Sequence, residues 1–247
     1  ILLSQIYAKA GISSALYLPA SVLSSNIIVS NDVATNSSIQ LACNFISSVI
    51  DSEDRNNLDF LNPNTTFVDY SKYFTLRALQ QQTKLRVFDT ASYNSDRHDE
   101  NFYYKVLSYW NQQETVDAFG QTSKTSTIVQ KADDVLSIDY ELSGFNSFKR
   151  MSLSDVELDM LNQKGCYYHT DFNGTTLLRE EVLDEFRGNE LFANLVDKKE
   201  LAEEIGSVSP MAVAQDIKDT IGYEVEPKYA EFLERSFEEV AETLIQQ

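Results

Sequence analysis

The order of hydrophobic and polar positions predicts helices in the first part of the chain. Apolar residues at positions 2, 3, 6, 7 and 10 follow helical spacing, and Gly11 is a natural stop for that helix. A second apolar stripe predicts a helix from Asn36 or Ser37 to Ile50, with Ser37 as its cap. The same reasoning predicts helices over 70–83 and 101–119 and a short strand over 85–88.

The period changes in the middle of the chain. Residues 125–129 are rich in β-forming side chains, and residues 136–142 alternate apolar with polar, which indicates a half-buried strand. Asn173-Gly174 separates two further β-forming runs. Because Asn-Gly supplies the two positive φ angles of a type I′ turn, a hairpin is predicted there.

The last part of the chain returns to helical patterns. Short helices are expected over 180–186, 191–196 and 199–205, followed by helices that begin at Pro210 and Pro227. The predicted class is therefore α+β and predominantly helical, with a small antiparallel β section at about 125–178 between helical N- and C-terminal parts. Three regions are expected: 1–120 mostly helical, 121–178 β-rich with the hairpin, and 179–247 acidic and helical.

The final predicted helix has one apolar stripe and one acidic face. The stripe packs either on the protein's own core or on a neighbouring subunit, and the acidic face would attract a basic neighbour. The interface residues expected from this pattern are Phe232, Leu233, Phe237, Val240 and Leu244 on the stripe, and Glu231, Glu234, Glu238, Glu239 and Glu242 on the acidic face.

Composition excludes several classes of protein. The 247 residues are 43% hydrophobic with only 8 Gly and 4 Pro, so the chain is neither disordered nor collagen-like. The formal charge of −18 argues against nucleic acid as the main partner, and the sequence has no apolar run long enough to span a membrane. Charge is uneven: residues 1–130 carry a net −3 and residues 131–247 a net −15. The acidic part is either a solvated surface or a face for a basic partner.

The motifs of several enzyme classes are missing from the sequence. It contains no GxxxxGK[ST], GxGxxG, CxxC, HExxH or GxSxG pattern, and only two histidines. Neither a catalytic residue, a metal site nor a cofactor is predicted. Many Ser, Thr, Asn, Tyr and Phe side chains suit protein–protein contacts better than catalysis.

Three polar groups remain as candidate sites. Asp96, His98 and Asp99 form the densest cluster, which is either an acid/base or metal site or a solvated turn before a helix. His169 lies between aromatic and acidic residues of a predicted strand. The acidic group Asp51, Glu53 and Asp54 could bind a cation but lacks the pattern of an EF-hand loop.

Two further features leave alternatives open. Cys43 and Cys166 are either two buried thiols or, in an oxidising compartment, a disulfide. Residue 1 is Ile, so the numbering starts inside a longer chain or follows processing. The opening residues lack the basic start of a signal peptide.

Two segments resemble a known family. Leu3-Ser-Gln-Ile-Tyr-Ala-Lys-Ala-Gly-Ile12 and Ile39-Gln-Leu-Ala-Cys-Asn-Phe-Ile-Ser-Ser-Val-Ile-Asp51 are similar to the first two helices of tailed-phage head-to-tail adaptor proteins. The resemblance covers about 50 residues, and the loop between the helices is longer than in that family. It implies a structural ring component without catalysis.

The function predicted from these observations is a non-catalytic structural protein of a self-assembling complex. A virus or bacteriophage particle (neck, tail or capsid) is expected, with copies of the chain and neighbouring structural proteins as partners and no membrane. The expected location is the virion, or otherwise the cytoplasm as a soluble protein. The alternatives are an enzyme of an unrecognised family with a hydrolase-like carboxylate/His site, and a surface ligand-binding module.

Overall fold

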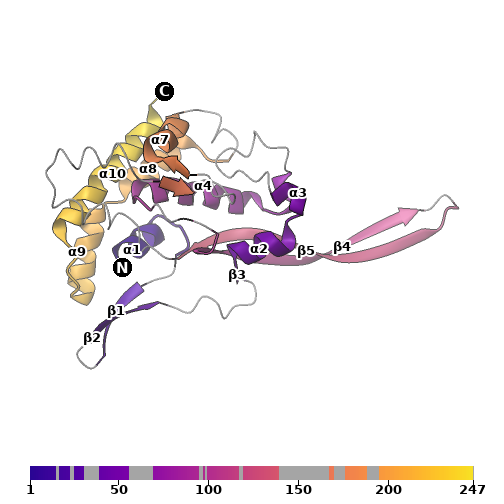
Figure 1. Ribbon diagram of the computed structural model, residues 1–247, viewed down its shortest axis with the longest axis horizontal. Coiled ribbons are helices and arrows are strands. Elements are labelled where there is room, and N and C mark those ends of the chain that lie inside the picture. Colours follow the sequence, from indigo (N-terminus) through magenta and orange to yellow (C-terminus); the bar gives the residue numbers. More distant parts are fainter. Residues whose placement is uncertain are drawn as a thin grey trace.

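Helices from both ends of the chain form one body, and two long strands leave it as an arm (Figure 1). The computed structural model describes residues 1–14, 17–22, 25–30, 39–55, 69–94, 97, 99–116, 119–138, 167–169, 176–187 and 195–246. The predicted α+β class is confirmed, because helical parts lie on both sides of a small antiparallel sheet in the chain.

The first half contains α1 (Leu2–Lys9), β1 (Tyr17–Val22), β2 (Ser25–Ser30), β3 (Ile39–Leu41), α2 (Ala42–Val49), α3 (Ser52–Arg55), a 3-10 turn (Tyr70–Lys72), α4 (Leu76–Ala91) and β4 (Phe102–Val116). The second half contains β5 (Thr122–Ser137), β6 (Tyr167–His169), β7 (Thr176–Leu178), α7 (Arg179–Arg187), α8 (Lys198–Ser207), α9 (Pro210–Ile221) and α10 (Pro227–Ile245).

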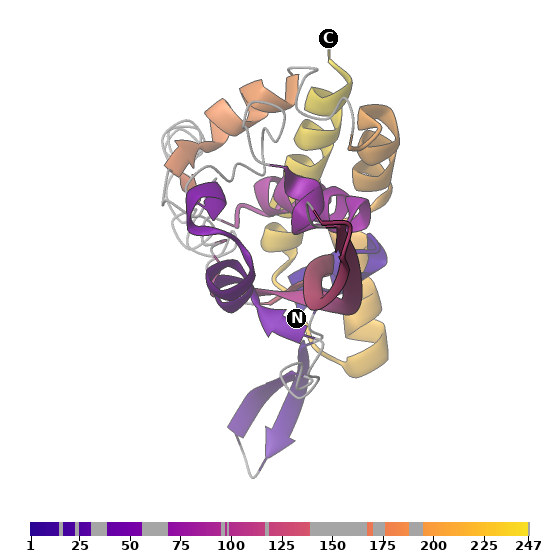
Figure 2. The same cartoon turned by 90° about the vertical axis from the view of Figure 1, so that its right-hand side faces the viewer.

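The main sheet has the order β3-β4-β5, and both pairs of strands are antiparallel. The ladder between β4 and β5 runs from Phe102↔Ser137 to Val116↔Thr122, with one irregularity between Lys105 and Val106. The short strand β3 pairs only with Tyr103–Lys105, at the base of the arm. In Figure 2 the β4–β5 arm points toward the reader, and the β1–β2 hairpin extends below the body.

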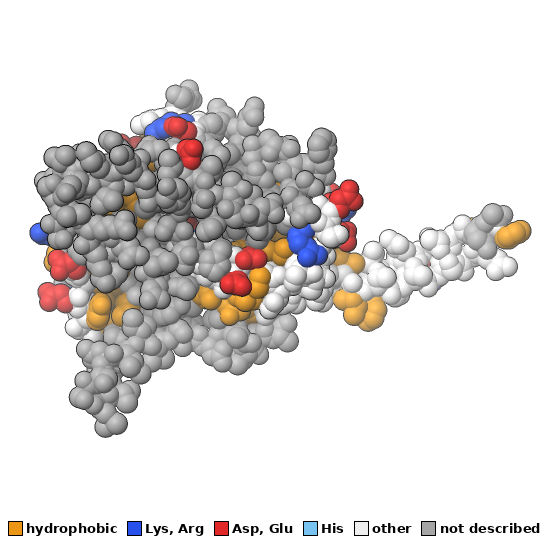
Figure 3. All heavy atoms as spheres, in the orientation of Figure 1, with side chains coloured by type: hydrophobic (Ala, Val, Ile, Leu, Met, Phe, Trp, Pro, Cys, Tyr) orange, Lys and Arg blue, Asp and Glu red, His pale blue; other side chains and the backbone are white. Residues whose placement is uncertain are grey.

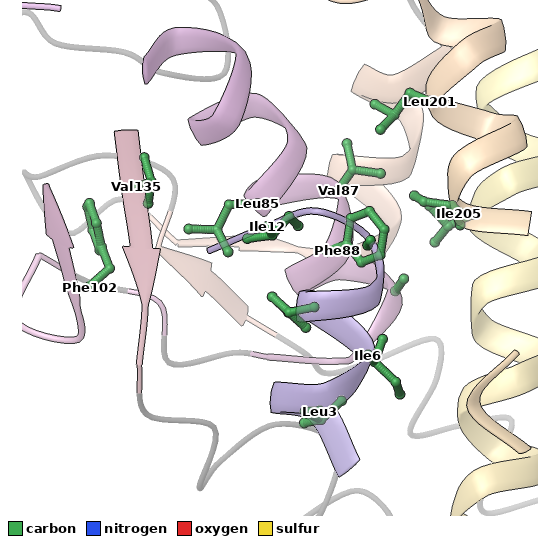
Figure 4. Close-up of a cluster of buried hydrophobic side chains, with 14 of the residues drawn as sticks. Leu3, Ile6, Ile12, Leu85, Val87, Phe88, Phe102, Val135, Leu201 and Ile205 are labelled. Carbon is green, nitrogen blue, oxygen red and sulfur yellow. The ribbon is translucent and has the colours of Figure 1, made fainter. Parts of the chain in front are cut away.

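The core joins α1, α4, the base of the sheet and the C-terminal helices. Figure 4 shows Ile6 of α1 near Phe88 of α4, with Leu201 and Ile205 of α8 on the far side of α4. Phe102 and Val135 extend the same cluster into β4 and β5. The base of the arm is therefore part of the core, and burial of apolar surface stabilises it.

Helix α4 includes the segment 85–88, where a strand was predicted. Thr75 caps its first turn by accepting a hydrogen bond from the Ala78 amide at 3.2 Å. Leu85, Val87 and Phe88 are all fully buried, which gives a continuous apolar run instead of a one-sided stripe. A helix buried on most sides shows no helical period, so the strand prediction was wrong.

The helix predicted over 101–119 is also wrong, because β4 occupies most of that range. Phe102, Tyr104 and Val106 alternate inward at the base, whereas the outer part of the strand is exposed and shows no alternation. Taken together, the apolar residues of the buried base and of the exposed outer part of β4 fall at helical spacing. The sequence pattern therefore predicted a helix.

The other end of the β section agrees with the sequence. Strands β6 and β7 pair antiparallel as the predicted hairpin, from Tyr167↔Leu178 to His169↔Thr176. The turn at Asn173-Gly174 lies outside the described residues. Gly11 has a φ of 70°, as expected of the residue that ends the first helix.

The apolar stripe of α10 packs within this chain. Phe232 lies on Tyr93 with ring centroids 4.8 Å apart, and Phe237 meets Phe88 edge-on at 5.7 Å. The Ser236 hydroxyl donates to the Ala91 carbonyl at 2.6 Å. Leu233, Val240 and Leu244 are buried as well, so the stripe belongs to the protein's own core.

The acidic face of α10 is largely open to solvent, with Glu231, Glu238, Glu239 and Glu242 exposed. Glu234 is the exception, since its carboxylate accepts hydrogen bonds from the Ser209 hydroxyl at 2.9 Å and the Met211 amide at 3.0 Å. Ser209 also caps α9. Among the described helices, none is long and apolar enough to cross a membrane.

Candidate functional site

The loop after α4 reverses the chain within a few residues. Ser92 ends the helix, and Tyr93 adopts a positive φ of 54°, which is uncommon for a residue with a side chain. The Asn94 amide then donates to the Asp89 carbonyl at 2.8 Å. The chain is thereby directed back along the end of α4, toward the start of β4.

A buried ion pair fixes the centre of this loop. Arg97 Nε donates to Asp89 Oδ2 at 2.9 Å, and Arg97 Nη2 donates to Asp89 Oδ1 at 3.0 Å. The two side chains are 3% and 0% exposed. Two parallel bonds between a guanidinium and a carboxylate fix orientation as well as distance. Arg97 is therefore held in one direction, toward the core.

The Asp89 carboxylate accepts two more hydrogen bonds. Tyr7 Oη of α1 donates to Oδ1 at 2.8 Å, and Asn94 Nδ2 donates to the same oxygen at 2.9 Å. Tyr7 also lies within 2.8 Å of the Ser92 hydroxyl. A buried charge is tolerated only when it is paired and hydrogen-bonded, and Asp89 meets both conditions.

The third guanidinium nitrogen joins the loop to the sheet. Arg97 Nη1 donates to the backbone carbonyls of Asn101 at 2.7 Å and Ile138 at 2.8 Å, and lies 3.3 Å from Asn101 Oδ1. Asn101 directly precedes β4, and Ile138 directly follows β5. One side chain therefore links the end of α4 to both strands of the arm.

Of the three residues predicted at this site, only Asp99 lies in the described part of the chain. Asp96 and His98 flank Arg97 in the sequence and lie outside it. The Asp99 carbonyl accepts from the Cys43 amide at 2.8 Å. Burial, followed by the charge of Asp99, raises the pKa of the Cys43 thiol. Cys43 is a free thiol, and Cys166 is not described.

The two strand ends at the base of the arm meet beside the loop. The Ile138 amide donates to the Asn101 carbonyl at 3.3 Å. Asp139 follows Ile138 in the sequence, although it lies outside the described residues. Sequence reasoning treated Asp139 as the polar side of a strand and did not connect it with the loop. Only the pairing of β4 with β5 brings Asn101 and Ile138 together.

The remaining predicted sites are separate from this loop in the chain. His169 is in β6, paired in register with Thr176, and its side chain is not described. Tyr73 Oη lies 2.8 Å from a carboxylate oxygen of Asp51 and 2.7 Å from one of Asp54. Burial and these two contacts raise the pKa of the Tyr73 phenol. Across the described ranges, no group of three or more His, Cys, Asp or Glu residues could hold a metal ion.

Comparisons with known proteins give little. No family model and no curated protein matches the sequence. One similar solved structure is a Helicobacter pylori proinflammatory kinase, CtkA, at 15% identity and a TM-score of 0.47, over 97% of this chain and 77% of that one. A likeness at this level supports neither a fold family nor an activity.

The same finding nevertheless bears on the function predicted from the sequence. The structure that was found is a kinase, not a component of a viral particle, and this contradicts the predicted virion or bacteriophage structural protein. That prediction relied on missing motifs and on a resemblance of about 50 residues. Missing motifs are weak evidence, because short patterns describe only some enzyme families.

Proposed function

We propose that this chain is an enzyme that transfers a phosphoryl group from a nucleoside triphosphate to a hydroxyl acceptor. The observation that carries the proposal is the buried Arg97, held by Asp89 and fixed between Asp96 and Asn101 in the sequence. The guanidinium of Arg97 is engaged in the bonds that hold the loop. We therefore assign the phosphoryl-transfer chemistry to the residues beside it in the sequence.

The spacing of these residues supports phosphoryl transfer. In the catalytic loop of protein kinases, His-Arg-Asp is followed by an Asn five positions after the Asp. That Asp accepts the proton of the attacking hydroxyl, and the Asn binds a metal ion. Here Asp96-Arg97-His98 has the reverse order, but Asn101 again follows the Asp by five positions. The sequence has no GxGxxG loop, in which it differs from that template.

The structure supplies an independent argument from the sheet. Asn101 and Ile138 are joined by a backbone hydrogen bond, so Asp139 is next in the chain to a residue that contacts the loop. A carboxamide and a carboxylate are oxygen ligands of the kind Mg²⁺ prefers. Asn101 Oδ1 lies 3.3 Å from Arg97 Nη1. The residue types therefore fit a divalent cation.

The proposed roles follow from these positions. Asp96 accepts the proton of the hydroxyl acceptor, and Asn101 and Asp139 would hold a divalent cation, which neutralises charge on the phosphates when bound. Arg97 and Asp89 position the loop without touching the substrate. Most of the rate enhancement in such sites comes from positioning and electrostatics, so a loop fixed by buried bonds suits the task.

The test is phosphate transfer by the purified full chain with ATP and Mg²⁺. Release of ADP and labelling of hydroxyl-bearing protein substrates should both be measured. Asp96→Asn should lower either rate by at least 100-fold, because general base catalysis contributes about 10²–10⁴-fold. Asp139→Asn should raise the Mg²⁺ concentration needed for half-maximal rate.

The matched control is Glu231→Gln, which removes an exposed carboxylate from α10. It should keep the wild-type rate. Circular dichroism and thermal unfolding of all variants confirm that they fold. A folded wild-type chain that neither binds ATP nor releases ADP under these conditions would refute the proposal.

A further inference from the structure

The outer half of the β4–β5 arm has open strand edges. On the β4 side, β3 pairs only with Tyr103–Lys105, and no other described strand lies beside residues 106–116. Figure 1 shows the outer arm extending away from the other labelled elements. A strand edge presents backbone N–H and C=O groups that can pair with another chain. Because an isolated two-stranded hairpin is marginal in water, a further strand would stabilise this part of the arm.

The contacts of Ala132 fix which backbone groups of the arm point outward. Its amide donates to the Tyr73 carbonyl and its carbonyl accepts from the Thr75 amide, both at 2.9 Å, so both groups point away from β4. Opposite residues of an antiparallel ladder alternate between pairs that exchange both hydrogen bonds and pairs that exchange none. Ala132 is opposite Val106, so Val106 directs its own N–H and C=O to the open edge of β4. The ladder continues without a further irregularity, and every second residue from Val106 to Val116 therefore does the same.

Exposed apolar side chains gather on β4 and not on β5. On the outer arm, the strand residues with large, exposed apolar side chains are Leu107, Tyr109, Trp110 and Val116 on β4, and Ile128 on β5. The open edge of β5 also contains Lys124, a residue type that protects an edge from pairing. Pairing at the β4 edge therefore buries more apolar surface than pairing at the β5 edge.

We infer that the open edge of β4 pairs with the same edge of a second copy of this chain, antiparallel and about a twofold axis at Asn111. Trp110 then lies opposite Gln112 of the second copy, and Val106 lies opposite Val116 of the second copy. In this register the outward-pointing residues form the hydrogen-bonded pairs, and the whole edge from 106 to 116 takes part. Any other register that matches these groups is shifted by two residues or more and leaves part of each edge unpaired.

The edge is complementary to itself in charge. Figure 3 shows the arm mostly in the colour of uncharged polar side chains and backbone, while acidic and basic groups gather on the body. Glu114 is the only charged residue between positions 106 and 116, and it forms an ion pair with Lys124 of its own chain. Across the inferred interface Glu114 lies opposite Ser108 of the second copy. No like charges meet, so the pairing has no electrostatic cost at the edge.

The same arrangement keeps the two acidic bodies apart. Each chain has a formal charge of −18, which opposes direct contact between the bodies. The two copies of Val106 are ten positions apart along the paired edges, which corresponds to about 33 Å at the usual rise of a strand. Charges are screened over about 8 Å at physiological salt, so repulsion across this gap is weak. An arm that holds the bodies apart therefore lets two copies of an acidic chain associate.

The inferred four-stranded sheet has one shared apolar patch. Trp110 and Ile128 are opposite each other in the arm and point to the same face. The Trp110 residues of the two copies are diagonal neighbours across the interface, a separation that aromatic side chains can bridge. The two Trp–Ile pairs therefore lie side by side on one face. Trp110 is the only Trp in the sequence, so its fluorescence reports on this contact.

The first experiment follows association of the full chain without nucleotide, so its result does not depend on the proposed reaction. Sedimentation velocity should show a monomer at micromolar concentration and a dimer as the concentration approaches millimolar. Trp emission should shift to shorter wavelength over the same range, and alternate amides from Ser108 to Val116 should gain protection from hydrogen exchange. A chain that stays monomeric would overturn the inference. Species larger than a dimer would also overturn it, because a twofold interface closes on itself.

Two proline variants identify the edge. Gln112 and Ser126 are opposite each other, and their amides point away from the hairpin, toward the β4 edge and the β5 edge respectively. Proline is tolerated where the missing N–H faces solvent. Gln112→Pro removes one hydrogen bond from each copy and should raise the dissociation constant of the dimer at least about 10-fold. Ser126→Pro is the matched control and should dimerise like wild type. A dimer that survives Gln112→Pro unchanged would overturn the assignment to β4.

A charge exchange tests the twofold axis and decides the case in which both prolines disturb the arm. Asn111→Lys and Asn111→Asp each place like charges opposite each other, so each variant should dimerise more weakly than wild type. An equimolar mixture should form a heterodimer more readily than either variant pairs with itself, and native mass spectrometry separates the three species. A mixture that shows no preference for the heterodimer would overturn pairing about Asn111.

Discussion

The two halves of the β4–β5 hairpin share one ladder but are stabilised differently. At the base, Phe102, Tyr104 and Val135 are buried in the core, and β3 adds a third strand. In the outer half, Trp110 is 68% exposed and Ile128, its partner across the arm, is 60% exposed. The described residues provide no third strand there. Within the described residues, the outer half is supported by backbone pairing and by exposed cross-strand contacts, such as the Glu114–Lys124 ion pair and the Thr115–Ser123 hydroxyl contact.

This difference shows which part of the β4–β5 hairpin unfolds together with the core and which part does not. A two-stranded hairpin is marginal in water unless a hydrophobic face is covered. Removing a contact at the base should affect unfolding of the whole protein, whereas the outer half should open locally. The base also lies against the Asp89–Arg97 pair, so the stable half is the one that adjoins the candidate site.

The largest loss in the free energy of unfolding is expected from removing the Asp89 carboxylate, which holds the loop. Asp89→Ala leaves the buried Arg97 without its partner, and loss of one member of a buried ion pair costs about 3–5 kcal/mol. Urea unfolding of the variant measures this cost. A cost below about 1 kcal/mol would mean that the pair is not buried in solution. Asp89→Asn keeps two acceptor sites on one oxygen and should lose less.

A smaller effect depends on pH. Burial, followed by the charge of Asp99, raises the pKa of the Tyr104 phenol well above its ordinary value of 10.0. Above about pH 10 the unfolded chain loses this proton and the folded chain keeps it. The free energy of unfolding should therefore fall with rising pH, by up to about 1.4 kcal/mol per pH unit from this group.

The check is Tyr104→Phe, which removes the ionisable group. It also removes the 3.3 Å hydrogen bond to Gln82, so some stability is lost at neutral pH. The slope of unfolding free energy between pH 10 and 11 should become shallower than in wild type. Burial also raises the pKa of Tyr229, so part of the slope should remain. An unchanged slope would contradict the assignment to Tyr104.

Removing the Thr75 cap, which joins α4 to the base of β5, should lower the free energy of unfolding moderately. Thr75→Ala removes the side-chain acceptor of the Ala78 amide and a 3.2 Å contact with Asp133, which costs about 1 kcal/mol. Thr75→Ser restores both acceptor and donor and should recover most of the loss. Thermal unfolding of the two variants tests the cap directly, and equal stability of both would exclude it.

The smallest effect is expected in the outer arm. Trp110→Thr should change the free energy of global unfolding by less than about 0.5 kcal/mol, since the side chain is mostly exposed. Hydrogen exchange should show faster exchange at residues 109–116 than at 102–106 in wild type. Uniform protection along β4 would instead mean that something covers the outer half.

Sequence reasoning succeeded where one face of an element is buried and a local signal ends it. The helix that begins at Pro227 and the hairpin on either side of Asn173-Gly174 both have a clear period and a local start or turn. It failed at α4 and β4. Helix α4 is buried on most sides, and strand β4 is exposed over its outer half. Neither has one apolar and one polar face, which is the contrast that produces a periodic sequence pattern.

The candidate site shows the same limit. The polar density around Asp96, Arg97 and Asp99 is visible in the sequence, in the loop that contains the buried Arg97. Its organisation is not visible there, because Tyr7 and Asp89 are 82 positions apart and Ile138 is 41 positions beyond Arg97. Nothing local indicates that Arg97 is directed inward to a carboxylate of α4 instead of outward to solvent.

The sequence by itself determined the class of fold, the acidic C-terminal helices and the position of the polar loop, because each depends on interactions between residues a few positions apart. Tertiary structure alone decided that α10 packs on its own chain, that β4 and β5 form an arm, and that Asp89 fixes Arg97. Those outcomes depend on which buried surfaces and charges meet, and burial is a property of the whole chain.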